Sequence, residues 1–437
     1  MTYIWFSSVI ETIKLIIASA FISLIIGSFT SIFAWKSSYK LAYYAPIMIL
    51  SVPPWLFAFF ISDYFTYIDP FIGASISLGI CSSPYCHAVI CSSLTSRAYK
   101  SYEALLVLNG LNIKSVLYAI YPSLRISVLP SIAIVSAEVV SDFGVANYFG
   151  LNTLTMLSYN IWSTTWSFSN SAYGIIWLII IGITLSLLKN TANSSINSSN
   201  SSKKSLYSCY LSLLPTVFFI VFCYFTSLSW LIGNGFFHSK RIIEELLNTT
   251  FLVVFVVTIN IMIGSLFLLR TGKIFEKVGI MTYSIPGIAI SLPLVHFLGQ
   301  KVSLMILLVI AISVRYFGLL VNILSSSLSG SSKYIETITI YSESGLIRIV
   351  NIFNFLLPSL AMGVSILVLE ITRELPISMV LHPAGFETIA MRMNHISKIE
   401  SPSLLGGQSV VLITIGLLFT CIIIWSTNDR NKKFEKQ

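Results

Sequence analysis

Residues Leu15–Ala34 read LIIASAFISLIIGSFTSIFA, a run of twenty residues without a charged side chain. An α-helix of about 20 apolar residues is long enough to cross the hydrocarbon core of a bilayer. Across all 437 residues, 55% are apolar, only 10% are charged, and the mean hydropathy is +0.85. Soluble domains carry about 25% charged residues, so this composition excludes a soluble enzyme. The sequence therefore predicts an all-α polytopic membrane protein.

Ten further apolar runs bring the number of predicted spans to about eleven. The eleven runs cover residues 15–34, 41–61, 71–94, 124–140, 172–188, 206–232, 251–269, 278–298, 302–324, 356–371 and 410–425. Between the fifth and sixth runs lies a Ser/Asn-rich stretch with no apolar face to bury, which predicts a flexible linker. We therefore predict four regions: a first repeat at 1–189, the linker at 190–205, a second repeat at 206–427 and a basic cytoplasmic tail at 428–437.

Basic residues orient these spans. If the N-terminus lies outside and the spans alternate, most Lys and Arg residues outside the spans fall on the inner side, including the tail Arg430–Lys436. This arrangement obeys the positive-inside rule, and the flipped topology would violate it. The net charge of +9 therefore indicates which loops face the cytoplasm, not that nucleic acid binds. We expect no cleavable signal peptide, a multi-pass location in a bacterial inner membrane, and contact with membrane lipid.

The two predicted halves repeat the same chemical features at a nearly constant offset. Three pairs of residues are 232 positions apart and a fourth pair is 233 apart. Parallel repeats of this kind place two similar bundles around one central pathway. The repeat therefore predicts a protein that moves a solute across the membrane. A duplicated membrane anchor is the alternative, although an anchor does not need acids inside its spans. The pairs are Pro54 with Pro286, Glu138 with Glu370, Asp142 with Glu374, and Glu103 with Glu336.

The predicted inner loop after the third span contains Glu103, Ala104, Asn109, Gly110 and Pro122. Its apolar positions recur every three or four residues, which predicts a short amphipathic helix, and Pro122 would then open the next span. The loop resembles the coupling loop of binding-protein-dependent ABC importers, whose pattern is Glu-Ala-Ala, a glycine three residues later, and a proline further on. Here Asn109 stands where that glycine is usual, and Gly110 comes one place late.

A second, weaker copy of this loop contains Glu336, Ser342, Gly345 and Pro358. Ser342 replaces the glycine, and Pro358 comes about three residues late. This resemblance implies an ATP-driven importer. The sequence has no phosphate-binding G-x-x-x-x-G-K-[ST] run, so the nucleotide would have to bind to another subunit. We expect that the chain is not itself an enzyme, that it holds no cofactor or assigned metal, and that two copies of a separate P-loop ATPase subunit dock on the two loops.

Two further strings narrow the resemblance to the ferric-iron ABC importer permeases with two fused permease halves. The first half contains DFG at Asp142–Gly144 and YFG at Tyr148–Gly150, and the second contains ELP at Glu374–Pro376 and GFET at Gly385–Thr388. Similar strings occupy the same places in that family. The resemblance implies that the chain passes ferric iron, delivered by a periplasmic binding protein, through the inner membrane. Those permeases usually carry an extra span at the start, the counterpart of 206–232. This sequence has no such run at its start, so either the topology has eleven spans or the true start lies upstream.

The four repeated acids have two possible roles. Glu138 with Asp142, and Glu370 with Glu374, are pairs at i and i+4, so each pair shares one helix face. Carboxylates suit hard cations, which makes these acids candidates for the translocation pathway. Alternatively, they pair with Arg315, Arg373 or helix ends and fix the packing of the spans.

Several alternatives remain for the function. Thiamine importers also use fused permeases, and polyamine, sulfate and molybdate importers have related halves, so the cargo could differ while the mechanism stays the same. An ion-gradient-driven secondary carrier belongs to a different class. The repeated coupling loops argue against that class, because such a carrier has no ATPase to engage.

Overall fold

The fold is known from a computed structural model that describes residues 2–37, 39–94, 113–189, 205–234, 239–268, 279, 281–329, 345–399 and 402–435. All regular elements within these ranges are helices. Eight described helices are long and apolar enough to cross a membrane, and a ninth span results if one bent pair of helices is counted. The chain is therefore a polytopic helical membrane protein, as the composition predicts.

Two shorter apolar helical stretches fall on two of the remaining predicted spans. They are Gly287–Leu298, and Leu356–Thr372 at the end of a longer helix that begins at Gly345. Each stretch is shorter than the roughly 20 residues that a membrane crossing requires. The total of eleven spans therefore stays a prediction.

The chain divides into two compact units. Unit 1 contains Met1–Phe237 and Asn394–Ile413, and unit 2 contains His238–Met393 and Thr414–Gln437. This division differs from the predicted repeats at helix α10 (Leu206–Asn234), which packs against α1 (Thr2–Ser37) and therefore belongs to unit 1. The predicted linker lies almost wholly outside the described residues. The predicted tail is described through Glu435, the last residue of helix α19 (Gly406–Glu435).

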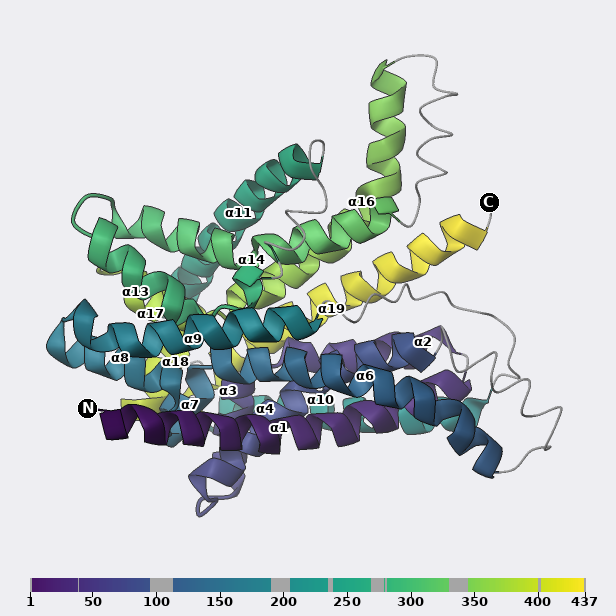
Figure 1. Cartoon of the computed structure of the whole chain (residues 1–437), viewed down its shortest axis with the longest axis horizontal. Coiled ribbons are helices and arrows are strands. Elements are labelled where there is room, and N and C mark those ends of the chain that lie inside the picture. Colours follow the sequence, from purple (N-terminus) through teal and green to yellow (C-terminus); the bar gives the residue numbers. More distant parts are fainter. Residues whose placement is uncertain are drawn as a thin grey trace. The chain divides into compact units, whose positions relative to one another are not determined.

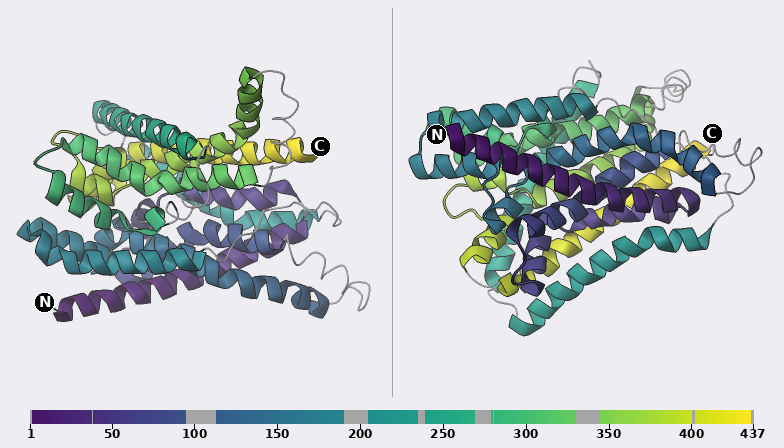
Figure 2. Two further views of the ribbon diagram at one scale, coloured as in Figure 1. Left: turned by 45° about the horizontal axis from the view of Figure 1, so that its top comes forward. Right: turned by 60° about the horizontal axis from the view of Figure 1, so that its bottom comes forward.

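In unit 1, the long helices α1 and α6 pack against α4. Helix α1 packs against α4, α6 and α10, and α6 packs against α9 (Figure 1). The views of Figure 2 show α1, in purple, as one unbroken helix. The remaining elements of the unit are α2 (Lys40–Tyr44), η1 (Ala45–Ser51), α3 (Pro54–Tyr64), α4 (Pro70–Ser93), α6 (Ile113–Ser141), α7 (Gly144–Phe149), α8 (Leu154–Thr165), α9 (Phe168–Lys189) and η3 (Pro402–Leu405).

In unit 2, helix α14 holds the central place. It packs against α11, α13, α16 and α17, and α13 also packs against α17. The elements are α11 (Ser239–Leu268), α13 (Gly287–Leu298), α14 (Leu304–Ser329), α16 (Gly345–Thr372) and α17 (Pro376–Leu381). Helix α18 (Ile389–Ile399) contributes residues to both units, as does α19.

The two units use the same pairs of neighbours. In unit 1, α4 packs against α1, α3, α6 and α7, and α3 packs against α7. In unit 2, α14 packs against α11, α13, α16 and α17, and α13 packs against α17. In chain order, α1, α3, α4, α6 and α7 thus occupy the places that α11, α13, α14, α16 and α17 occupy in unit 2.

Each unit also has a helix break at the sequence Ser-Val/Ile-Pro. Pro53 is the N-cap of α3 with φ −61° and ψ 144°, and Pro286 is the N-cap of α13 with φ −58° and ψ 143°. A proline suits this position because its φ is fixed and it has no N–H to leave unpaired. Before α3 the break bends the chain by 76°. The proline that matches Pro286 by helix position is therefore Pro53, whereas the sequence offset selects Pro54, which lies one residue inside α3.

Two prolines assigned to the coupling regions lie inside long helices. Pro122 is inside α6 and Pro358 is inside α16, and Figure 1 shows α16 sharply bent along its length. Pro122 lies near the start of the candidate span Ile120–Ser141, as predicted, but not at the start of its helix, because α6 begins at Ile113. An interior proline removes one backbone hydrogen bond and bends a helix, so both positions are suited to kinks. Gly345 is the first residue of α16.

Candidate functional site

The four repeated acids lie where a long helix meets a short one. In unit 1, Glu138 belongs to α6, and Asp142 lies between the last residue of α6 and Phe143, the N-cap of α7. In unit 2, Glu370 belongs to α16 and Glu374 lies between α16 and α17. Glu370 and Glu374 are buried, with 6% and 4% of their surface exposed. A buried carboxylate needs hydrogen bonds or a cation, so the partners of each acid indicate what it can do.

Asp142 accepts hydrogen bonds from the first turn of α7. Its Oδ2 lies 3.0 Å from the backbone N of Val145 and 3.2 Å from that of Ala146. Helix N-termini have unpaired N–H groups and a partial positive charge, both of which favour a carboxylate. The Thr155 hydroxyl donates to the carbonyl oxygen of Asp142 at 3.0 Å, which ties the start of α8 to the same point. Asp142 therefore joins the ends of α6, α7 and α8.

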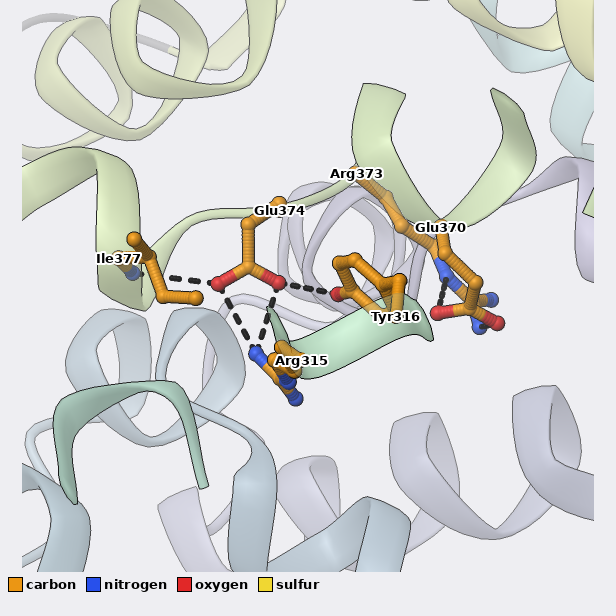
Figure 3. A network of polar contacts seen from close by, with 6 residues as sticks. All are labelled: Arg315, Tyr316, Glu370, Arg373, Glu374 and Ile377. Atoms are coloured by element: carbon orange, nitrogen blue, oxygen red, sulfur yellow. Dashed lines mark hydrogen bonds and ion pairs between the residues drawn. The ribbon is translucent and has the colours of Figure 1, made fainter. Parts of the chain in front are cut away.

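Glu374 performs the same capping in unit 2 and also binds a cation. Its Oε1 accepts from the backbone N of Ile377 at 3.1 Å, and Ile377 is 232 positions after Val145. The Nη1 of Arg315 lies 2.9 Å from Oε1 and 2.7 Å from Oε2 of Glu374, and both side chains are buried. The Tyr316 hydroxyl donates to Oε2 as well. Figure 3 shows Glu374 between Arg315, Tyr316 and Ile377.

Glu370 forms a separate ion pair with Arg373. The Nε of Arg373 lies 3.2 Å from Oε2 of Glu370, and Nη2 binds Oε1. Arg373 is three positions after Glu370, so the pair bridges one turn at the end of α16. In Figure 3, Tyr316 lies between this ion pair and Glu374. Each of the two repeated acids of unit 2 thus has its own arginine.

The contact between the broken span and the short helix is filled differently in the two units. In unit 1, Trp55 of α3 packs on Gly144 of α7, where an added Cβ would lie 2.7 Å from the Trp55 Cβ. In unit 2, Gly287 is the first residue of α13, and an added Cβ there would lie 2.7 Å from the Arg315 Nη1 and 2.8 Å from the Ile377 Cγ1 of α17. An indole therefore packs at this contact in unit 1, and a guanidinium packs at it in unit 2.

These contacts are those of the second role considered for the acids, namely pairing with Arg315, Arg373 and helix ends. Within the part of the chain that the structure describes, no group of three or more His, Cys, Asp or Glu side chains could hold a metal ion. A role of Glu138, Asp142, Glu370 and Glu374 in a translocation pathway stays a prediction. Tyr316 was not predicted, because no local pattern in the sequence marks it as a partner of Glu374.

Six of the candidate coupling residues lie outside the described residues. The structure therefore offers no view of the contacts that an ATPase would make there. These residues are Glu103, Ala104, Asn109, Gly110, Glu336 and Ser342.

Comparisons with known proteins give no relative. No family model matches the chain, no curated protein sequence matches it, and no solved structure matches its fold.

Proposed function

We propose that the chain is the membrane permease subunit of an ATP-driven ABC importer whose cargo is ferric iron. The observation that carries the proposal is the correspondence between the two units. The breaks at Pro53 and Pro286 lie 233 positions apart, and the capping acids Asp142 and Glu374 lie 232 apart. Shared helix neighbours add to this agreement. Together they support a duplicated bundle in the parallel sense, an architecture that suits a transport pathway.

The coupling-loop pattern supports an external motor. Two loops with a Glu near their start occur at the repeat offset, and they fall on the side that the positive-inside rule assigns to the cytoplasm. Two ATPase subunits would dock there and a periplasmic binding protein would deliver the cargo on the other side, in a bacterial inner membrane. ATP hydrolysis would alternate the access of the pathway between the two sides.

Ferric iron is favoured by the resemblance of the DFG, YFG, ELP and GFET strings. Thiamine, polyamines and inorganic anions such as sulfate or molybdate are the alternative cargoes. An ion-gradient-driven carrier is the second candidate function, and the buried pair of Arg315 and Glu374 favours it, because such pairs mark ion and proton routes in membrane proteins.

One reconstitution tests these options. We would purify the tagged chain from its native membrane, identify the subunits that accompany it, and reconstitute the assembly in proteoliposomes. We expect a P-loop ATPase among the subunits and ATP-dependent uptake of radiolabelled ferric iron when binding protein is supplied. Uptake of thiamine instead would keep the class and change the cargo. Solute movement by the chain alone, without a nucleotide-hydrolysing subunit, would overturn the proposal in favour of the carrier.

A further inference from the structure

Asn260 is a fully buried amide near one end of a candidate membrane span. It lies on α11 within the candidate span Arg241–Gly264, and 0% of its surface is exposed. Neither its Nδ2 nor its Oδ1 has a hydrogen-bond partner among the residues that the structure describes. Burying an amide without hydrogen-bond partners is strongly unfavourable. Buried polar groups in this situation are usually satisfied by ordered water.

The amide faces the seam between α11 and α14. One turn after Asn260, a Cβ on Gly264 would lie 3.6 Å from Leu320 and 3.9 Å from Val321 of α14. Residues at i and i+4 share a helix face, so Asn260 points to the same seam. A Cβ on Gly363 of α16 would lie 2.7 Å from Leu320, which places this seam where three helices meet.

A second polar group without a partner lies on the opposite side of the seam. The hydroxyl of Ser313 is buried and has no hydrogen-bond partner within the described ranges. Ser313 is seven positions before Leu320, so both residues lie on one face of α14. Since a single predicted span separates α11 from α14, the two helices cross the membrane in the same direction. At about 1.5 Å per residue, Asn260 and Ser313 then lie within about one turn of each other along the seam.

At the matched place in unit 1, α1 and α4 approach each other closely. Gly27 of α1 is 233 positions before Asn260, and a Cβ there would lie 2.5 Å from the Cβ of Cys86 on α4. Two polar side chains beside it have partners on α4. The Oγ1 of Thr30 lies 2.8 Å from the Nδ1 of His87, and the Ser31 hydroxyl donates to the His87 carbonyl oxygen at 3.1 Å. Unit 1 closes on a glycine, whereas unit 2 carries an amide at the matched position.

We propose that Asn260 and Ser313 line a small hydrated site inside unit 2, between α11 and α14. The site binds molecules that both donate and accept hydrogen bonds, namely water or the hydration shell of a passing cation. An amide supplies both kinds of group, and a serine hydroxyl can do the same. Hydration of the site is independent of the proposed transport function, whereas its contact with cargo rests on that function.

Thiol labelling tests the hydration directly. In a Cys421→Ser background, which removes the one exposed cysteine among six, Asn260→Cys and Ser313→Cys would be made separately in the full chain in lipid nanodiscs. Thr258→Cys is the matched control, because Thr258 lies on the same span, is exposed on the helix surface and hydrogen-bonds its own backbone. A charged methanethiosulfonate reagent needs water to reach a thiolate. We expect both site cysteines to react at least about tenfold faster than the control.

The outcomes separate this proposal from the transport proposal. If neither site cysteine reacts faster than Thr258→Cys, the hydrated site does not exist. If one variant fails to fold, the other carries the same test. Labelling by water-soluble reagent together with absence of ATP-dependent uptake would leave the site intact and reject the importer. Cargo contact is tested by Asn260→Leu, which should lower uptake at least about fivefold, while Thr258→Val leaves it unchanged; equal uptake in both variants would reject that contact.

Discussion

The junction before α7 in unit 1 and the junction before α17 in unit 2 have the same kind of cap, but different side chains pack beside it. Both short helices have six residues, and both are capped by an acid at the matched position. In unit 1 the neighbouring space holds the apolar indole of Trp55. In unit 2 it holds a guanidinium that binds the capping acid.

Acids at matched positions of the two units therefore need not have the same role. Asp142 can be stabilised by N–H groups alone, because helix ends supply both donors and a favourable dipole. Glu374 is tied to Arg315 and Tyr316, so it works as part of a buried charged cluster. We therefore expect substitutions in unit 2 to affect stability more than the matched substitutions in unit 1.

The largest effect is expected for Arg315→Met. It leaves the Glu374 carboxylate buried without its cation, and removing one partner of a buried ion pair costs about 3–5 kcal/mol. Thermal unfolding of the purified chain in detergent should show a large drop in the midpoint. The double variant Arg315→Met with Glu374→Gln should recover much of this loss, because it leaves no uncompensated charge. A single variant as stable as the parent would show that the pair does not stabilise unit 2.

Gly144→Ala tests the apolar junction of unit 1. The new methyl group would lie 2.7 Å from the Trp55 Cβ, and overpacking of this kind costs about 1–3 kcal/mol. The same unfolding measurement applies. Combining it with Trp55→Leu should give a smaller loss than the sum of the two single variants, because the smaller side chain makes room. Strict additivity would mean that the two residues do not press on each other.

Asp142→Ala isolates the cap. Loss of an acceptor for first-turn N–H groups costs about 0.5–2 kcal/mol, which is less than the loss expected at Arg315. Asp142→Asn keeps an acceptor oxygen and should fall between Ala and the parent in unfolding midpoint. If Asn destabilises the chain as strongly as Ala, the negative charge of Asp142 matters more than its hydrogen bonds.

Features of the two units that depend on residues close together in the chain could be predicted from the sequence. The apolar runs, the paired acids and the offset between the halves could all be predicted, because each depends on a few neighbouring residues. Arg315 and Arg373 were expected as possible partners, but which acid each of them binds could not be predicted. Arg315 is 59 positions from Glu374, and their contact depends on how α14 packs against α17. The seam at Asn260 likewise depends on helix packing that no local pattern specifies.

The smallest effect is expected for Thr155→Val, which tests how much the hydrogen bond from α8 to Asp142 contributes to stability. The hydroxyl of Thr155 donates to the Asp142 carbonyl, and valine keeps the shape while removing the donor. A single hydrogen bond of this kind contributes about 0.5–1.5 kcal/mol net, and we expect a value at the lower end. The backbone of Asp142 would still be held by α6 and its side chain by α7, so the loss should add to that of Asp142→Ala. A non-additive result in the double variant would mean that α8, through Thr155, also positions the carboxylate that caps α7.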